Sequence, residues 1–306
     1  MTAHAFRDHL LATLYVAPDC IEPGRLIRFG KNKSCWCKLF DDCRGGVFGD
    51  WATSFHSHWL TDSKDNMAPQ ERLALARQIN QASRDREREQ CRRFLANGKR
   101  NAELMAAAHR VKTGDPVAKY LTQRKLPGAW KSTASCLRLH AGLPYVHEGE
   151  HVGNFPTMLA PLCTADGLML SIHRTYLTED GQKADVPTVK KLTPASGSLR
   201  GASIQIGCPV EGVLGVAEGI ETALAASMAS GIPVWSAYCA NGLSTFVWPI
   251  GVRKLVIFGD ADAAGRKATE DLRVRANRAG LQVATLIPRT EGMDWADVHA
   301  TAEETL

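Results

Sequence analysis

The chain has 306 residues, of which 44% are hydrophobic and 23% are charged, so it is long enough and apolar enough to form about two globular domains. This composition excludes a disordered chain, and the absence of a Gly-X-Y repeat or of sustained heptads excludes a fibre. Lys and Arg number 37 against 32 Asp and Glu, and the net charge of +5 is compatible with a polyanionic partner without requiring one.

The sequence shows no sign of export or of membrane insertion. Its first 20 residues have mixed charge and lack the basic start and the cleavage site of a secretory signal. The long uncharged stretch between Thr222 and Val252 contains Pro233 and Pro249, which would break a membrane helix, so we expect it to be buried core. Nine scattered cysteines, an odd number, argue against a disulfide scaffold and indicate the cytoplasm.

Residues 1–68 predict a small β-rich module. Short apolar runs at 26–29, 37–40 and 47–48 predict strands, because the turn formers GKNKS and DDCRGG separate them.

Residues 69–100 then predict one long charged helix that links this module to the rest, since strong helix formers follow one another without Gly or Pro until Gly98. We interpret the helix as a solvated connector, with a surface for nucleic-acid phosphates as the alternative. Its basic residues are Arg84, Arg86, Arg88, Arg92, Arg93, Lys99 and Arg100.

Residues 101–210 predict a mixed α+β region. Helices are expected at 103–111 and 116–124, followed by short strands within 157–177. The segment TADG between two apolar runs favours a hairpin, because Asp166 and Gly167 adopt the positive φ angles of tight turns.

Residues 211–306 predict a compact α/β domain. Strands at 213–217, 233–238, 254–260 and 282–288 are almost continuously apolar, and helices are expected at 221–231 and 263–280. This alternation is typical of a parallel sheet flanked by helices.

Five acidic residues follow the strands of this predicted sheet. Glu218 comes directly after the first strand, Asp260 and Asp262 after a later one, and Asp294 and Asp297 shortly after the last. The carboxyl ends of parallel strands meet at one edge of a sheet, where active sites form. Helix capping is the alternative for a single member of the set, such as Asp262 or Glu218.

Carboxylates gathered at one edge repel one another unless a divalent cation neutralises them. Hard oxygen ligands of this kind suit Mg2+ or Mn2+. Such ions orient phosphate groups and stabilise the charge that develops during phosphoryl or nucleotidyl transfer. The ordered acidic set therefore predicts a metal-dependent site for that chemistry.

Two groups of cationic residues are candidates to bind a nucleotide or a template strand, since Arg presents a fork that matches phosphate oxygens. Ordinary surface charge is the alternative for each of them. The candidates are His173, Arg174, Lys190, Lys191, Arg266 and Lys267.

One group of softer ligands stands in the N-terminal module: Cys35, Cys37, Cys43, His56 and His58. The spacing CWCKLFDDC does not match the paired C-x2-C knuckles of a tetrahedral zinc site. We therefore favour buried thiols in a small sheet over zinc.

The segments VAEGIETALA, VIFGDADAAGRKA and GMDWADV resemble the Toprim domain of bacterial primases, topoisomerases and some nucleases. The likeness is greatest to Toprim DNA primases of phages, plasmids and integrative elements. Upstream, GDWATS, GDPVAKYLTQRKLP, FPTMLAPLCTADGLMLSIHRTYLTEDGQKA and KKLTP resemble segments that precede the Toprim domain in those primases. The resemblance covers about residues 28–298 and implies a Rossmann-like parallel sheet.

By this resemblance Glu218 acts as a general base or helps to hold metal, Asp260 and Asp262 bind Mg2+, and Asp294 with Asp297 forms a trailing acidic motif. The implied reaction is metal-dependent synthesis of short RNA primers from NTPs on single-stranded DNA. No G-x-x-x-x-G-K-[ST] motif occurs, so unwinding would need a separate helicase.

Two alternatives remain open. A Toprim nuclease would use the same metals to cleave phosphodiesters. A non-catalytic nucleic-acid-binding module of replication or anti-defence would carry a degenerate acidic site.

Overall fold

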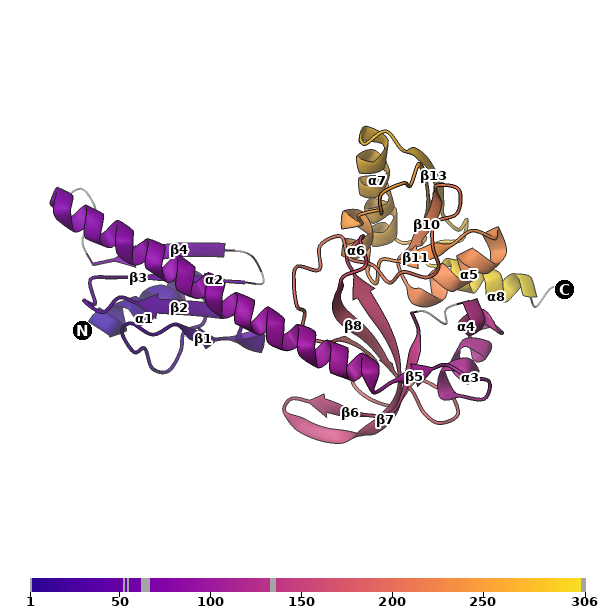
Figure 1. Cartoon of the computed structure of the whole chain (residues 1–306), viewed down its shortest axis with the longest axis horizontal. Helices are drawn as coiled ribbons and strands as arrows, with labels where there is room; N and C mark the ends of the chain where they lie inside the picture. The colour runs from indigo at the N-terminus through magenta and orange to yellow at the C-terminus, as the bar shows by residue number, and fades with distance from the viewer. Residues whose placement is uncertain (1, 52, 54, 62–66, 133–135, 304–306) are drawn as a thin grey trace. The chain divides into compact units, whose positions relative to one another are not determined.

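The computed structural model describes residues 2–51, 53, 55–61, 67–132 and 136–303 (Figure 1). The chain forms two compact units, residues 1–93 and 94–306. Helix α2 (Pro69–Ala106) contributes residues to both.

The first unit is built on an antiparallel sheet of strand order β1-β2-β3-β4. Strands β1 (Ile27–Phe29), β2 (Cys35–Leu39) and β3 (Gly45–Asp50) confirm the three predicted strands, while β4 (Phe55–Leu60), α1 (Thr2–Leu14) and a 3-10 turn at Lys31–Lys33 were not predicted. Residues 52 and 54 of the GDWATS segment lie outside the described residues.

Helices cover both faces of this sheet. Phe6 and Leu10 of α1 are fully buried against the face that carries Phe48. Leu75 and Ala82 of α2 join the buried cluster on the opposite face, to which alternate residues of β2 and β3 point. The first half of α2 is therefore packed on the sheet through these apolar residues and is not wholly solvated.

The strand register separates the candidate zinc ligands. Cys37 is paired with Phe48 and Phe48 with Ser57, so these side chains share the α1 face, and Cys35 lies on it too. His56 and His58 alternate with Ser57 and point to the other face. Burial raises the pKa of the Cys37 thiol to about 12, so Cys37 is a neutral core residue. These thiols and imidazoles cannot converge on one ion.

The second unit contains an antiparallel sheet of order β5-β6-β7-β8-β9. Its strands are β5 (His109–Arg110), β6 (Arg138–His147), β7 (Glu150–Cys163), β8 (Met169–Tyr176) and β9 (Lys190–Leu192), with α3 (Pro116–Gln123) and α4 (Ala129–Ser132) beside them. The predicted hairpin is confirmed, since the Thr164 N–H donates to the Leu168 carbonyl at 2.9 Å. Of the two expected turn residues only Gly167 has a positive φ, 94°, and the expectation for Asp166 was wrong.

The separate helix predicted at 103–111 is wrong. Residues 103–106 continue α2, because Leu104 and Met105 pack into the core of the antiparallel sheet and the buried Asn101 side chain donates to the Pro194 carbonyl at 3.2 Å. His109 and Arg110 then pair with β6 as strand β5. The sequence of a short polar segment does not show by itself that the segment will pair with the edge of a distant strand.

The C-terminal part of the second unit is the predicted parallel sheet, and its strand order is β11-β10-β12-β13. The strands are β10 (Val213–Ala217), β11 (Val234–Ser236), β12 (Lys254–Phe258) and β13 (Gln282–Leu286). Helices α5 (Ile220–Ser230) and α8 (Trp295–Glu303) cover one face, and α6 (Ala240–Thr245) and α7 (Ala263–Arg278) the other (Figure 1).

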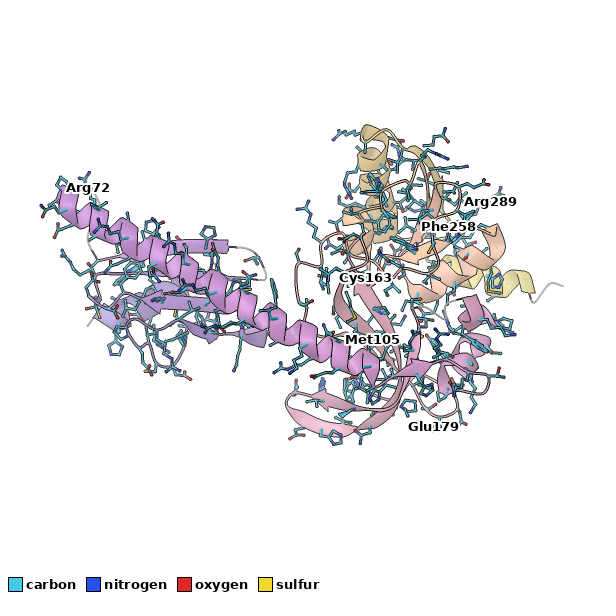
Figure 2. The ribbon with its side chains drawn as sticks, in the orientation of Figure 1. Arg72, Met105, Cys163, Glu179, Phe258 and Arg289 are labelled. Carbon is cyan, nitrogen blue, oxygen red and sulfur yellow. The ribbon has the colours of Figure 1, made fainter. Side chains whose placement is uncertain are left out.

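Alternate side chains of each central strand account for this double covering. Leu214 and Val216 of β10 pack in the cluster that contains Leu272 of α7. Phe258, labelled in Figure 2, faces the other way and meets Trp295 edge-on with ring centroids 5.8 Å apart. Both faces are apolar, which is why the strands read as almost continuous hydrophobic runs.

A short segment joins the two sheets of the second unit. Ser203 pairs with Cys163 at the end of β7, and the next residue, Ile204, pairs with Ser236 of β11. One hydrophobic core runs through both parts and includes Leu162 and Ala223. None of the described helices is both long and apolar enough to cross a membrane.

Candidate active site

The acidic residues lie at the point where the strand order of the parallel sheet reverses. Ala217 of β10 is paired with Phe258 of β12, so Glu218 and Asp260 stand one and two residues beyond strand ends at the same level. The chain passes from β10 to β11 on one side and returns to β12 on the other. Doubly wound sheets leave a crevice at this point, outside the carboxyl ends of their strands.

Asp260 is the most perturbed carboxylate of the group. Burial, and then the charges of Glu218, Asp294, Asp262 and Asp297, raise the pKa of Asp260 to about 7. Its Oδ1 atom is buried and has no hydrogen-bond partner. A buried carboxylate oxygen that faces only like charges fits a divalent cation.

Glu218 shares this environment. Burial and the charges of Asp262 and Asp294 raise the pKa of the Glu218 carboxyl, while a hydrogen bond from the Ala240 backbone lowers it. The five predicted acidic residues therefore act on one another electrostatically, although their sequence positions span 80 residues of chain from 218 to 297.

The other three carboxylates also cap helices. Asp262 accepts a hydrogen bond from the Gly265 N–H at 2.6 Å, which is the capping role weighed as its alternative. Asp294 accepts from the Asp297 N–H at 2.9 Å, and Asp297 accepts in return from the Asp294 N–H at 3.2 Å. Thr222 Oγ1 donates to the second oxygen of Asp294 at 3.3 Å. The caps fix these carboxylates in place.

Among the residues that the structure describes, no three His, Cys, Asp or Glu side chains are arranged so that they could hold a metal ion by themselves. The carboxylates offer part of a coordination shell. Mg2+ usually takes one or two carboxylates and completes its shell with water and with substrate phosphates, so this donor set fits it. Asp260, with Asp262 or Glu218 beside it, would supply those one or two carboxylates.

Cationic groups from the antiparallel region share one cavity with these acids. The cavity has a volume of about 370 Å³ and is lined by Glu218, Asp260 and Asp294 of the parallel sheet. Its basic lining residues are Arg124, Lys183 and Lys190. The Arg124 Nε atom is buried and has no hydrogen-bond partner.

The structure divides the four cationic candidates of β8 and β9 between two faces of the antiparallel sheet. His173 and Lys190 line the cavity. Arg174 instead donates to the Leu192 carbonyl at 2.9 Å, and Lys191 donates to the Val146 carbonyl at 2.9 Å, so both lie outside it. Adjacent residues of a strand point to opposite faces, and the choice of face depends on the register.

His173 is not the cation that was expected. Burial, and then the charge of Lys190, lower its pKa to about 4, so the imidazole is neutral at pH 7. Its Nδ1 atom is buried without a hydrogen-bond partner.

Arg266 and Lys267 do not line the cavity. Arg266 forms an ion pair with Glu291 at 2.8 Å, and Lys267 forms one with Asp271 at 2.9 Å on the same helix. The structure therefore places both residues as surface charges of α7, the alternative weighed for them.

Glu221 was missed by the sequence reasoning. It is 5% exposed, accepts a hydrogen bond from the Tyr120 hydroxyl at 2.5 Å and pairs with the Lys190 ammonium at 3.0 Å. Burial alone would raise the pKa of Glu221, but Lys190 and Tyr120 lower it to about 2. A single acid inside the apolar helix segment IETALAASMA was the available signal, since a buried carboxylate needs a partner.

Gly265 allows α7 to approach Asp260. A Cβ atom at this position would lie 2.7 Å from the Asp260 carbonyl oxygen and 3.0 Å from its Cβ. We expect Gly265→Ala to lower the free energy of unfolding by about 1–3 kcal/mol and to weaken Mg2+ binding about tenfold or more. Calorimetric titration and thermal unfolding test this, with the exposed Ala264→Ser as control. Unchanged metal affinity in Gly265→Ala would contradict it.

Comparison with known families identifies the C-terminal part of the chain. Residues 213–303 match the family model described as Toprim domain, which confirms the predicted Toprim domain and its α/β fold. Residues 96–206 match a family described as a domain of unknown function (DUF7146). No curated protein matches the chain.

Several solved structures of DNA primases are similar to the chain. A DNA primase domain from Pseudomonas aeruginosa has 15% identity and a TM-score of 0.36, and the match covers 52% of this chain and 52% of that one. The primase fragment of the bacteriophage T7 primase-helicase has 16% identity and a TM-score of 0.42, over 61% and 71% of the two chains. The Aquifex aeolicus primase (zinc binding and RNA polymerase domains) has 13% identity and a TM-score of 0.44, and the match covers 99% of this chain and 82% of that one.

Proposed function

We propose that the chain is a DNA primase that synthesises short RNA primers on single-stranded DNA by metal-dependent nucleotidyl transfer. The observation that carries this proposal is one cavity in which Asp260, whose Oδ1 atom has no hydrogen-bond partner, lies with Glu218 and Asp294 and meets Lys190, Lys183 and Arg124. A nucleoside triphosphate with its divalent cation needs this combination of charges.

The reaction assigns a role to each side of the cavity. The primer 3′ oxygen forms a bond to the α-phosphorus, the bond to pyrophosphate breaks, and the hydroxyl proton passes to the Glu218 carboxylate, whose raised pKa favours proton acceptance. Lys190, Lys183 and Arg124 bind the triphosphate oxygens. Asp260 and Asp262 would hold a Mg2+ or Mn2+ ion, which would neutralise the phosphate charge.

Purified chain incubated with Mg2+ or Mn2+, labelled NTPs and a panel of single-stranded DNA templates should produce oligoribonucleotides. A Toprim nuclease would instead shorten labelled DNA or RNA when no NTP is present. A non-catalytic binding module would do neither, and calorimetry would detect no Mg2+ or Mn2+ at the acidic residues. Each outcome other than primer synthesis contradicts the proposal.

The wider setting belongs to the same proposal. A primase of a phage, plasmid or integrative element would work in the cytoplasm beside a separate helicase that exposes its template. Co-purification of the chain with helicases encoded next to it would test that association.

A further inference from the structure

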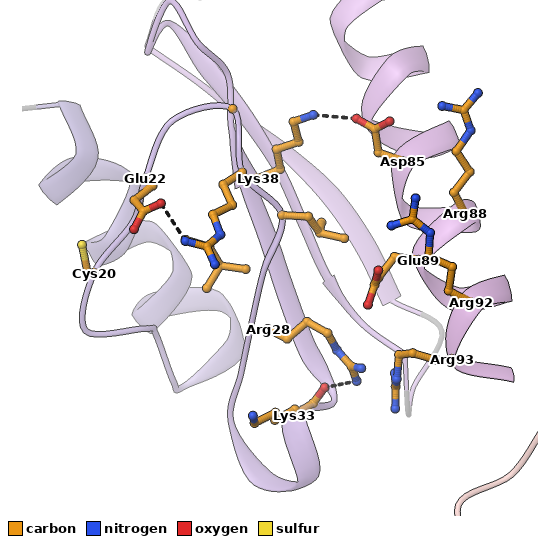
Figure 3. A pocket seen from close by; sticks show the side chains of 14 residues that line it. Cys20, Glu22, Arg28, Lys33, Lys38, Asp85, Arg88, Glu89, Arg92 and Arg93 are labelled. Atoms are coloured by element: carbon orange, nitrogen blue, oxygen red, sulfur yellow. Dashed lines mark hydrogen bonds and ion pairs between the residues drawn. The ribbon is translucent and has the colours of Figure 1, made fainter. Parts of the chain in front are cut away.

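A large basic groove lies within the first unit, between the β1–β2 side of the sheet and helix α2 (Figure 3). It has a volume of about 950 Å³. Three acids line it, Glu22, Asp85 and Glu89. The cationic residues that line it are Arg25, Arg28, Lys33 and Lys38 on the sheet side and Arg88, Arg92 and Arg93 on α2.

Most of this positive charge is not neutralised within the unit. Lys38 pairs with Asp85 at 2.6 Å, and Arg25 pairs with Glu22 at 2.9 Å. Among the described residues, no ion pair is formed by the remaining five cations of the groove, which are Arg28, Lys33, Arg88, Arg92 and Arg93. Figure 3 shows the Arg28 guanidinium on the sheet side extending toward Arg93 of α2. The groove therefore attracts anions.

The guanidinium groups of two of these arginines lie over the same tryptophan ring. The Arg28 guanidinium lies 4.3 Å from the centroid of the Trp51 ring, and that of Arg93 lies 5.8 Å from the same ring. Arg28 Nε is buried without a hydrogen-bond partner. Burial, and then the neighbouring charge of Arg93, lower the pKa of Arg28 to about 10, and the charge of Glu89 offsets only part of this, so the two guanidiniums repel each other where they meet. An anion bound between them would relieve that repulsion.

We propose that this groove binds a single strand of DNA, with its phosphates on the arginines of α2 and its bases against the guanidinium planes. Arg88 and Arg92 are one helical turn apart, about 6 Å along the axis, so they present a row of charge to a chain of phosphates. Unstacked bases stack on Arg planes as they do on aromatic rings. An acidic peptide would pair with the positive charges of the groove, but it has no bases to stack on the guanidinium planes.

The choice of DNA as the ligand rests on the proposed function. The groove itself is a second site, made entirely of residues 20–93 and separate from the acidic cavity. The sequence left open whether the long helix is a solvated connector or a surface for nucleic-acid phosphates. The groove favours the second interpretation for Arg88, Arg92 and Arg93. Lys99 takes no part, because it lies outside the groove and pairs with Glu103 at 3.9 Å.

The test compares two double variants of the full chain that each remove two exposed arginines from α2. Arg88→Ala/Arg92→Ala empties the groove side, and Arg77→Ala/Arg84→Ala is the control outside the groove. Binding of fluorescent dT20 is measured by anisotropy in EDTA without nucleotides, over a range of salt concentrations. Alanine keeps the helix intact, and thermal unfolding verifies this.

We expect the groove variant to bind dT20 about tenfold or more weakly and to lower the slope of log K against log salt by about 1.4, since each phosphate contact on a single strand contributes about 0.7. The control should stay within about twofold of the wild type. Equal losses in both variants would overturn the proposal. So would a 20-residue polyglutamate that displaces dT20 as well as unlabelled dT20 does, because charge alone would then suffice.

Binding and synthesis fail separately in these experiments. A chain that binds dT20 through the groove but makes no primers refutes the primase proposal and leaves the groove site intact. A chain that makes primers while Arg88→Ala/Arg92→Ala binds like the wild type refutes the groove site alone.

Discussion

Asp260→Asn should reduce primer synthesis by at least about 100-fold, because the amide removes the buried charge on which a divalent cation depends. The shape of the side chain is conserved, so the fold should survive. Asp271→Asn is a matched control on the neighbouring helix α7, where the carboxylate only pairs with Lys267 on the surface. Rates of oligoribonucleotide synthesis with Mg2+ measure both. Activity of Asp260→Asn within a few fold of the wild type would contradict the assigned site.

The same substitution should change how stability depends on pH when metal is removed. The pKa of Asp260 is raised from 3.8 to about 7 in the folded chain. Between about pH 4 and pH 7 the folded chain therefore holds a proton that the unfolded chain has lost, and stability falls as the pH rises. Above pH 7 Asp260 is ionised in the folded chain, and its ionisation lowers the free energy of unfolding by at most a few kcal/mol, as an order of magnitude.

Thermal unfolding in EDTA measures this effect. The wild type should lose stability from pH 5 to pH 8 more steeply than Asp260→Asn, and Mg2+ should restore more stability at pH 8 than at pH 5. Asp271→Asn should follow the wild type. Identical pH profiles for wild type and Asp260→Asn would show that Asp260 is not buried among like charges.

Lys190→Ala should lower the free energy of unfolding at pH 7 by about 2 kcal/mol, because it leaves the Glu221 carboxylate buried without its counter-ion. The value lies below the roughly 3–5 kcal/mol of a fully buried pair, since the Lys190 side chain is 41% exposed and water can reach the vacated space. Lys191→Ala is the control one residue away on the other face, where the ammonium lies 3.8 Å from the Tyr145 ring, and it should cost about 1 kcal/mol or less.

A double-mutant cycle assigns the loss to the pair. Adding Glu221→Gln to Lys190→Ala should recover part of the stability, because an amide needs no counter-ion and still accepts from Tyr120. The pKa of Glu221 is lowered to about 2, so the contribution of the pair is present above pH 4.5 and is lost as the pH falls toward 2. Additive effects of the two substitutions in chemical denaturation would contradict the pairing.

Lys190 also connects this pair to the cavity. Its ammonium is held by Glu221 yet lines the same cavity as Asp260. Lys190→Ala should therefore raise the KM for NTPs as well as lower stability, whereas Glu221→Gln should affect KM less because the ammonium remains. This difference separates nucleotide binding from a purely structural role.

The order of strands and acids could be predicted from the sequence because its signals are local. A parallel strand buried on both faces is a short apolar run, and Glu218, Asp260 and Asp262 follow such runs within one to four residues of the strand ends. The long helix α2 could also be predicted, since residues 70–97 contain no Gly or Pro. These features depend on neighbours along the chain.

Only the tertiary structure decided which cations meet those acids. His173 and Arg174 are adjacent in sequence, but the strand alternation sends one into the cavity and the other to the opposite face. Glu221 finds Tyr120 at a separation of 101 residues, and strand register puts Cys37 and His58 on opposite faces of the N-terminal sheet. The sequence by itself determined a parallel sheet edged with carboxylates. Register and long-range packing, which no local pattern encodes, determined what faces them.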